Sequence, residues 1–166
     1  MCIFSQDVDA VYGTKIFARK SEGNGQFLVY SMGYEANQEL AMILPLPTSA
    51  IPGEDAIRFI DLSEYSEFFE AMDSIFPVPR GVSASYKSTT LKVHSVGNFE
   101  ASFVPHRNDF ARLDRKFCLS DVIWDKLSQY HDFSFAVFKL KAGDKEIHPM
   151  AFEFPRRNPD ELYFPR

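Results

Sequence analysis

Cys2 is the residue whose type and position most directly suggest chemistry. It follows the initiator methionine, and removal of Met1 would leave a cysteine with both a thiol and a free α-amine. Such a residue supplies a nucleophile and a general base together, as a cysteine hydrolase requires. The competing interpretation is packing, because Cys2 opens an apolar run and cysteine is among the most often buried residue types. Packing is the stronger interpretation of the two.

The other residues that could bind a metal or do redox chemistry show no pattern for it. Cys118 stands between Phe117 and Leu119, which predicts a small buried hydrophobic residue, and two cysteines do not make a disulfide framework. No close ligand spacing links the four histidines, which are His94, His106, His131 and His148. We therefore expect no metal site and no cofactor.

The charge balance makes nucleic acid an unfavourable partner. The formal net charge is −5, whereas binding to a phosphate backbone depends on clustered Lys and Arg. Two aspartates interrupt the one basic cluster, which consists of Arg107, Arg112, Arg115 and Lys116. That mixture is typical of a solvated helix face.

Length and composition predict one globular domain over residues 1–166. A chain of 166 residues buries enough surface to fold without a metal or a disulfide. The aromatic content of 15% favours a β-rich core. No run approaches the ~18 apolar residues of a membrane span and no leader peptide pattern opens the chain, so we predict a cytoplasmic protein with no membrane association.

The elements that must position Cys2 begin with four extended runs. These are residues 2–5, 15–19, 26–34 and 40–44, and they predict an antiparallel meander that stops at the Pro45 and Pro47 pair. Apolar residues then recur at spacings of three and four over residues 62–76, which predicts a helix lying on that sheet. Pro77 and Pro79 are expected to end this helix.

The second part of the chain repeats the order of strands and helix. Strands are predicted at residues 90–96 and 99–104 around the Gly97-Asn98 turn, and at residues 133–140 and 148–154 around the turn 142–144. Two short helices are predicted between these pairs, at residues 108–116 and 120–130. The fold class is therefore α+β, with antiparallel sheets, helices packed on one face, and two similar strand-strand-helix halves at 1–80 and 81–155. The remaining residues 156–166 are predicted to form an exposed tail.

The proline-rich segment that follows residue 44 is a candidate contact site. It is rigid and apolar, and Leu46 and Ile51 are its candidate binding residues if it displays them on the surface. The alternative is a tight crossover that buries both side chains, and this is the commoner outcome for apolar loop residues.

Three stretches in order resemble a known family. The first is residues 32–47 behind an N-terminal cysteine, the second is the glycine-hinged run 96–101, and the third joins residues 127–140 to 148–152. Their order is similar to that of a bacterial domain of unknown function, the family numbered 2330. The resemblance implies an architecture without an activity. Members of that family usually look exported, and this chain shows no such signal.

The start of the chain also resembles N-terminal-nucleophile amidohydrolases of the choloylglycine hydrolase type. That resemblance makes Cys2 the nucleophile, its own amine the base, and Arg19 the neighbouring cation. The aspartate that follows in that family is absent, since Lys20, Ser21 and Glu22 stand there. We therefore predict a binding domain for a protein or small-molecule partner, with the cysteine amidohydrolase as the alternative. Under the binding hypothesis, Arg19 is a sheet-edge charge that discourages aggregation.

Overall fold

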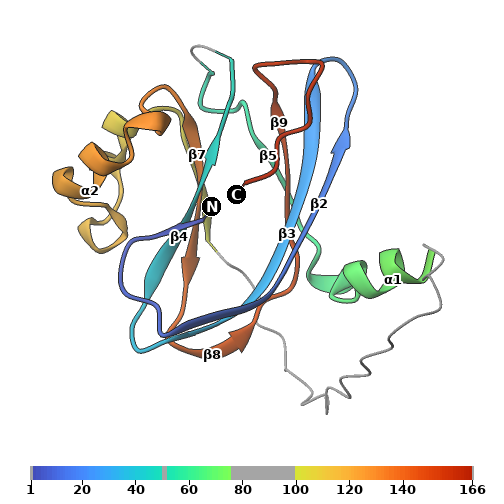
Figure 1. Cartoon of the computed structure of the whole chain (residues 1–166), viewed down its shortest axis with the longest axis horizontal. Coiled ribbons are helices and arrows are strands. Elements are labelled where there is room, and N and C mark those ends of the chain that lie inside the picture. Colours follow the sequence, from blue (N-terminus) through green and yellow to red (C-terminus); the bar gives the residue numbers. More distant parts are fainter. Residues whose placement is uncertain (1, 50–51, 76–99, 166) are drawn as a thin grey trace.

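The computed structural model describes residues 2–49, 52–75 and 100–165. In this part of the chain the strands form two antiparallel sheets that face each other, with helical segments outside both sheets (Figure 1). This arrangement confirms the predicted α+β class with antiparallel sheets, and each sheet has a helical layer on one face.

The first sheet has the order β1-β4-β7-β6 in the described residues. Its strands are β1 (Ile3–Phe4), β4 (Leu40–Leu46), β7 (Ser134–Leu140) and β6 (Ala101–Val104). Every residue of β4 is buried, because the strand is internal and both of its faces are covered. That burial explains the continuous apolar run of β4. The strand extends two residues past the predicted end at residue 44.

The second sheet has the order β2-β3-β9-β5, with β8 also paired to β3. Its strands are β2 (Ala10–Lys20), β3 (Gly25–Ala36), β9 (Met150–Pro155), β5 (Arg58–Ile60) and β8 (Gly143–Glu146). The two strands β9 and β8 lie one after the other along the same side of the long strand β3. β8 overlaps the turn predicted at residues 142–144, and the predicted strands on either side of that turn, now β7 and β9, lie in different sheets.

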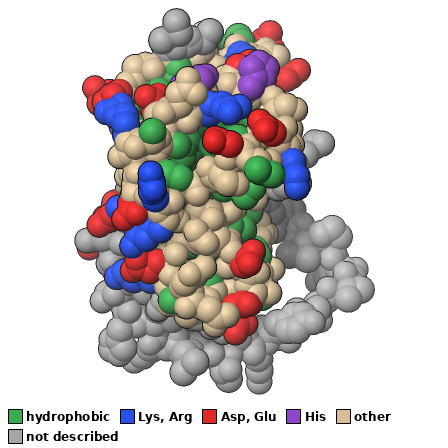
Figure 2. All heavy atoms as spheres, turned by 90° about the vertical axis from the view of Figure 1, so that its left-hand side faces the viewer, with side chains coloured by type: hydrophobic (Ala, Val, Ile, Leu, Met, Phe, Trp, Pro, Cys, Tyr) green, Lys and Arg blue, Asp and Glu red, His purple; other side chains and the backbone are tan. Residues whose placement is uncertain are grey.

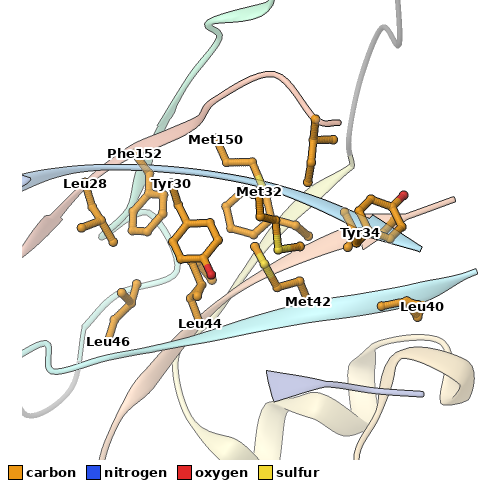
Figure 3. Close-up of a cluster of buried hydrophobic side chains, with 14 of the residues drawn as sticks. Leu28, Tyr30, Met32, Tyr34, Leu40, Met42, Leu44, Leu46, Met150 and Phe152 are labelled. Carbon is orange, nitrogen blue, oxygen red and sulfur yellow. The ribbon is translucent and has the colours of Figure 1, made fainter. Parts of the chain in front are cut away.

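The main hydrophobic core fills the space between the sheets. Alternate residues of β3 point into it, including Leu28, Tyr30 and Met32, and those of β4 meet them from the other sheet (Figure 3). The side chains between these residues along each strand point outward. Strand alternation therefore produces one inner face and one outer face for each sheet.

A helical segment covers the outer face of the first sheet. Its pieces are η2 (Arg107–Arg112), η3 (Arg115–Phe117), α2 (Asp121–Lys126) and η4 (Ser128–Tyr130). The rings of Phe110, Trp124 and Phe135 lie edge to face within 5.0–5.3 Å of one another between this segment and the sheet. The predicted helices at 108–116 and 120–130 fall in this segment as short turns.

A shorter helical cover lies on the outer face of the second sheet. It consists of η1 (Ser63–Tyr65) and α1 (Phe68–Ile75). Phe69 packs on Val29 and Ala151 of the sheet, and Phe68 meets the Phe17 ring at 5.5 Å. The predicted helix therefore rests on a sheet, although it begins about one and a half turns later than residue 62.

The predicted meander is wrong at two of its three pairings. Residues 2–5 do not pair with 15–19, and residues 26–34 do not pair with 40–44, because β1 and β4 belong to one sheet and β2 and β3 to the other. β3 pairs with β2, β8 and β9, while β4 pairs with β1 and β7. The ranges 1–80 and 81–155 consequently both contribute strands to both sheets and are interleaved.

The predicted exposed tail at 156–166 is corrected in part. Arg156 and Pro165 are buried, and Tyr163 is half buried against the core. Gln26, which is fully buried, donates its side-chain N–H to the Tyr163 carbonyl (2.6 Å) and accepts from the Tyr163 N–H (2.9 Å). The Gln26 side chain thus supplies the Tyr163 backbone with the donor and acceptor that a neighbouring strand would otherwise provide.

Several predicted features lie outside the described residues. They are Ile51, the end of the helix at residue 76 with Pro77 and Pro79, the strand at 90–96 and the Gly97-Asn98 turn. No helix in the described part of the chain is long and apolar enough to cross a membrane.

Candidate functional site

Cys2 lies at the edge of the main core, immediately before β1. Its thiol is half buried, packs against the core, and accepts a hydrogen bond from the Tyr30 hydroxyl at 3.4 Å. Burial of the Tyr30 ring, together with this bond to the sulfur, raises the pKa of the Tyr30 hydroxyl above its ordinary value. Tyr30 therefore stays protonated and donates to the sulfur. No other hydrogen bond to the Cys2 sulfur is found in the described residues.

Arg19 is not a neighbour of this thiol, contrary to the amidohydrolase hypothesis. Arg19 stands opposite Phe27 in the β2–β3 pair. Each lies two residues along its strand from a side chain packed on the outer face under α1, Phe17 for Arg19 and Val29 for Phe27, so both side chains lie on that outer face. Tyr30, which contacts Cys2, points to the inner face. The sheet itself separates the guanidinium from the sulfur, so the predicted pair of catalytic residues is wrong as a pair.

Leu46 is fully buried between the sheets, so it is not displayed as the contact-site hypothesis required, and burial, the commoner outcome, applies to this residue. The physical reason is that β4 continues through Pro45, and its alternation turns Leu46 inward beside Leu44 (Figure 3). Ile51, the other candidate binding residue, lies outside the described part of the chain.

The remaining cysteine and the described histidines play local roles. The Cys118 thiol donates to the Phe110 carbonyl at 3.2 Å, and burial raises the pKa of this thiol. His106 accepts the N–H of Asn108 at the start of η2. Within the described ranges, no group of three or more His, Cys, Asp or Glu side chains is placed to hold a metal ion.

Arg19 belongs to a row of side chains that crosses the second sheet on its outer face. Arg19, Phe27, Glu153 and Arg58 stand opposite one another on four consecutive strands, β2, β3, β9 and β5. Both guanidinium carbons lie over the Phe27 ring, at 5.8 Å for Arg19 and 5.9 Å for Arg58. Arg58 also binds the Glu153 carboxylate at 2.6 Å.

Glu153 is held ionised at the centre of this row. The nearby Ser21 hydroxyl and the Arg58 guanidinium lower the pKa of its carboxyl, and of these two only the Arg58 contact has hydrogen-bond geometry, at 2.6 Å. A hollow of about 330 Å³, lined in part by Arg58, Glu153 and the turn residues Glu22 and Asn24, adjoins the row. Arg19 stands at the far end of the row, and no carboxylate among the described residues forms an ion pair with it.

The β2 strand that carries Arg19 is an open edge of its sheet. It pairs with β3 alone in the described part of the chain, and it runs along the right-hand side of the sandwich in Figure 1. Other edge strands are short: β1 has two residues, β5 three, and β6 and β8 four each. β2, with 11 residues, is the long exposed edge of the described structure.

A bulge divides β2 into two parts. The register shifts between Tyr12 and Lys15, and Gly13 supplies the left-handed backbone there at φ 60°. Before the bulge, the Tyr12 ring lies on Gly33, where a Cβ would come within 2.0 Å of it. After the bulge, residues 15–20 pair regularly with β3. The regular part therefore offers six consecutive residues for further pairing.

The direction of the free backbone groups follows from the hairpin. The Ser21 N–H donates to the Gly25 carbonyl at 3.1 Å, so Ser21 faces β3. Successive residues of an antiparallel strand turn their N–H and C=O to opposite sides. Ile16, Ala18 and Lys20 therefore direct these groups away from β3, at the open edge.

A second hollow lies beside the helical cover of the first sheet, with a volume of about 570 Å³. Its ammonium and carboxylate groups neutralise one another: Lys116 binds Glu39 at 2.7 Å and Lys139 binds Glu100. These pairs lower the pKa of both glutamates. The face with the helical cover shows acidic and basic groups intermixed (Figure 2). Within the predicted basic cluster, Arg112 pairs with Glu54 and Asp109. We assign this hollow to surface ion pairing.

Sequence reasoning missed the open edge as a site. It did assign Arg19 to a sheet edge. The sequence feature that could have revealed the open edge is the charge of β2, which carries Lys15, Arg19 and Lys20 without one acidic residue. Which strand lies at an edge depends on pairings that are distant in sequence, such as β3 with β9.

Fold and site together define the class: a two-sheet antiparallel sandwich with helical covers and one long open edge strand. No protein-family profile matches the chain. Among solved structures, baculovirus P35 is similar, with a TM-score of 0.52 over 93% of this chain at 13% sequence identity. The matched region is 58% of the P35 chain, and the likeness concerns the fold alone. The resemblances to family 2330 and to choloylglycine hydrolases stay predictions.

Proposed function

We propose that this protein is a binding domain that engages a partner protein by adding a strand of the partner to β2. The observation that carries the proposal is the open edge at residues 15–20, where Ile16 and Ala18 direct N–H and C=O groups that have no backbone partner in the described part of the chain. The Lys20 N–H lies on the same edge, while the Lys20 carbonyl accepts a long hydrogen bond from the Arg19 side chain. Strand addition of this kind draws affinity from main-chain hydrogen bonds and specificity from alternate side chains.

The surroundings of the edge support this proposal. Ile16 and Ala18 are half buried on the inner face, and Phe17 is half buried on the outer face against Phe68. Their apolar surface would be covered further by a neighbouring strand. The other edges of the described sheets are too short to hold a partner over six residues.

The test uses Ala18→Pro, which removes one outward N–H without touching the bonds to β3. Proline is tolerated at an edge position of this kind. Ala18→Val is the matched control, because it keeps the N–H and has high strand propensity. Circular dichroism first confirms that both variants fold.

Random decapeptides displayed on phage are the probe for binding. Peptides selected on the unmodified protein should bind Ala18→Val and lose at least about tenfold in affinity for Ala18→Pro, since the Ala18 N–H is lost as a donor and the proline ring crowds the peptide carbonyl that would have accepted from it. Selected peptides that bind both variants equally would refute strand addition at β2.

The second candidate function is a cysteine amidohydrolase acting through Cys2. The supporting observation is a half-buried thiol whose sulfur accepts a hydrogen bond from the Tyr30 hydroxyl, so a polar group lies beside the candidate nucleophile. In this mechanism the N-terminal amine takes the thiol proton as the sulfur attacks an amide carbonyl, and it gives that proton to the departing amine as the C–N bond breaks. Water then hydrolyses the thioester, which releases the acid and restores the thiol.

The hydrolase is tested with N-acyl p-nitroanilides as substrates. Cys2→Ser should abolish turnover while Cys118→Ser keeps it, because Cys118 is held in a structural hydrogen bond. Mass spectrometry of the active material should show that Met1 has been removed. Retained Met1, or turnover by Cys2→Ser, would exclude the mechanism.

A further inference from the structure

We propose that the strand which adds to β2 is an extended acidic segment of the partner protein, with carboxylates facing Arg19 and Lys20 and apolar side chains facing Ile16, Phe17 and Ala18. This inference rests on the proposed strand addition and specifies the chemistry of the occupant.

The charge of β2 is the first argument. Its three cations are Lys15, Arg19 and Lys20, and the strand has no acidic residue. Lys15 is bound to Glu70 of α1 at 3.2 Å, whereas Arg19 and Lys20 form no ion pair with the described residues. The one hydrogen bond of the Arg19 side chain is a long one, 3.4 Å to the Lys20 carbonyl. Most of its N–H donors therefore point to solvent.

The position of Arg19 in the cross-strand row is the second argument. From β5 to β2 the row reads Arg58, Glu153, Phe27, Arg19, so cations flank an anion and a ring. A carboxylate on an added strand would stand next in this row. Arg19 would form a non-hydrogen-bonded pair with it, because its own backbone groups face β3, and side chains approach most closely in such pairs.

A guanidinium that is already held over the Phe27 ring also loses less freedom on binding. Its planar fork fits a carboxylate with two parallel hydrogen bonds. The geometry therefore favours a glutamate or aspartate opposite Arg19 over a neutral polar side chain.

A second copy of this chain is a poorer occupant of the edge. Two copies joined through β2 would bring Arg19 and Lys20 of both molecules onto one seam, and β2 supplies no carboxylate to separate them. Like charges that face each other across a strand pair are destabilising. The same charges that discourage self-association thus select an acidic partner.

Neighbouring residues of β2 set the rest of the pattern. In an antiparallel arrangement the residue opposite Ala18 and the one opposite Ile16 would face the half-buried inner side, and the residue opposite Phe17 would face its ring on the outer side. The complementary hexapeptide is Glu-Glu-Val-Tyr-Val-Thr, with its first residue opposite Lys20. The basic counterpart is Lys-Lys-Val-Tyr-Val-Thr.

The experiment measures the affinity of both capped hexapeptides for the full chain by NMR titration at one ionic strength. The acidic peptide should bind the unmodified protein at least about tenfold more tightly than the basic peptide, as two charge reversals across a strand pair allow. Arg19→Glu should weaken the acidic peptide and strengthen the basic one. Lys126→Glu, an equal charge change on α2, should leave the preference unchanged.

Backbone pairing is checked separately with two singly N-methylated acidic peptides. The methyl groups are placed on adjacent residues, so one N–H faces β2 and the other faces solvent. Strand addition predicts that only one of the two peptides loses binding. Equal binding of both would mean that charge alone attracts the peptide, and this would overturn the proposal.

The outcomes separate the inference from the proposed function. If the basic peptide binds the edge as well as the acidic one, and Ala18→Pro blocks both, strand addition stands and the acidic preference is wrong. If neither peptide shifts the β2 amides at millimolar concentration, or if Arg19→Glu behaves as Lys126→Glu does, the acidic preference is also refuted. A concentration-dependent dimer lost in Ala18→Pro would assign the edge to a second copy.

Discussion

Gln26 shows at the residue scale how one polar side chain holds a chain end. Its amide is fully buried, and its two hydrogen bonds with the Tyr163 backbone imitate a strand pair. Arg157 fixes the same region, because it donates to the Thr48 carbonyl and to Asp132, and its guanidinium lies over the Phe133 ring at 5.1 Å. The C-terminal segment is therefore part of the sandwich.

We expect Gln26→Ala to lower the free energy of unfolding by about 2–3 kcal/mol, because both backbone groups of Tyr163 lose their partner in a half-buried setting. Urea denaturation measures the change. Gln38→Ala, at an exposed glutamine, is the matched control and should cost less than about 0.5 kcal/mol. Equal costs for the two variants would contradict the assignment.

At the scale of elements, strand parity decides which side chains meet. Arg19 and Tyr30 lie on adjacent strands, yet their side chains lie on opposite faces of the sheet. Because Tyr30 contacts Cys2, the sheet also separates Arg19 from Cys2, the two residues that the hydrolase hypothesis needs together. The same parity aligns Arg19 with Phe27, Glu153 and Arg58. Arg19 therefore lies at the edge of the sheet and not beside the candidate nucleophile.

The α1 helix depends on the sheet below it. With eight residues it is too short to be stable alone, and Phe69 provides its buried contact with Val29 and Ala151. We expect Phe69→Ala to destabilise the protein by about 3 kcal/mol, or to release α1 locally. Hydrogen exchange of the α1 amides distinguishes the two results.

The control for this helix is Ile75→Ala, because the Ile75 side chain is 70% exposed. It should change the unfolding free energy by about 0.5 kcal/mol or less and leave the exchange rates of residues 68–72 unchanged. If Phe69→Ala has no larger effect than this control, α1 does not rest on the sheet through Phe69.

At the scale of the whole molecule, buried tyrosine hydroxyls couple stability to alkaline pH. Burial raises the pKa of Tyr30, Tyr34 and Tyr163 above the ordinary value of 10.0, so the fold favours their neutral forms. This contribution is fully present below the unfolded pKa of about 10 and is lost as the pH rises above it, because the unfolded chain then releases protons that the folded chain retains.

We expect the unfolding free energy to fall steadily above about pH 10, and Tyr34→Phe to make that fall shallower. Urea denaturation at a series of alkaline pH values, with phenolate absorbance near 295 nm as a second signal, checks both statements. Tyr65→Phe, at an exposed ring, is the control and should leave the slope unchanged. A slope equal in all three proteins would show that buried tyrosines do not control alkaline stability.

The sequence by itself determined the local elements and the fold class. Periodicity located the strands at 134–140 and 150–155 and the helix over Phe68 and Phe69, because each depends on neighbours within a few residues. Cap residues located the short helix after Ser120, and they placed the one before it two residues too late, since that helix begins at Arg107 with His106 as its cap. Charge patterning identified the mixed-charge surface around Arg112 and placed Arg19 on a sheet edge.

Tertiary structure alone decided where these elements meet. That β3 and β4 belong to different sheets, that Leu46 turns inward and that β2 is left as the long open edge all follow from pairings such as β3 with β9 and β4 with β7. These pairings join residues about a hundred positions apart, where no local pattern acts. Alternation along a strand fixes which of its residues share a face, but only packing decides which face lies against the core. The pairings therefore also decide that Cys2 lies at the core and Arg19 on the outer face.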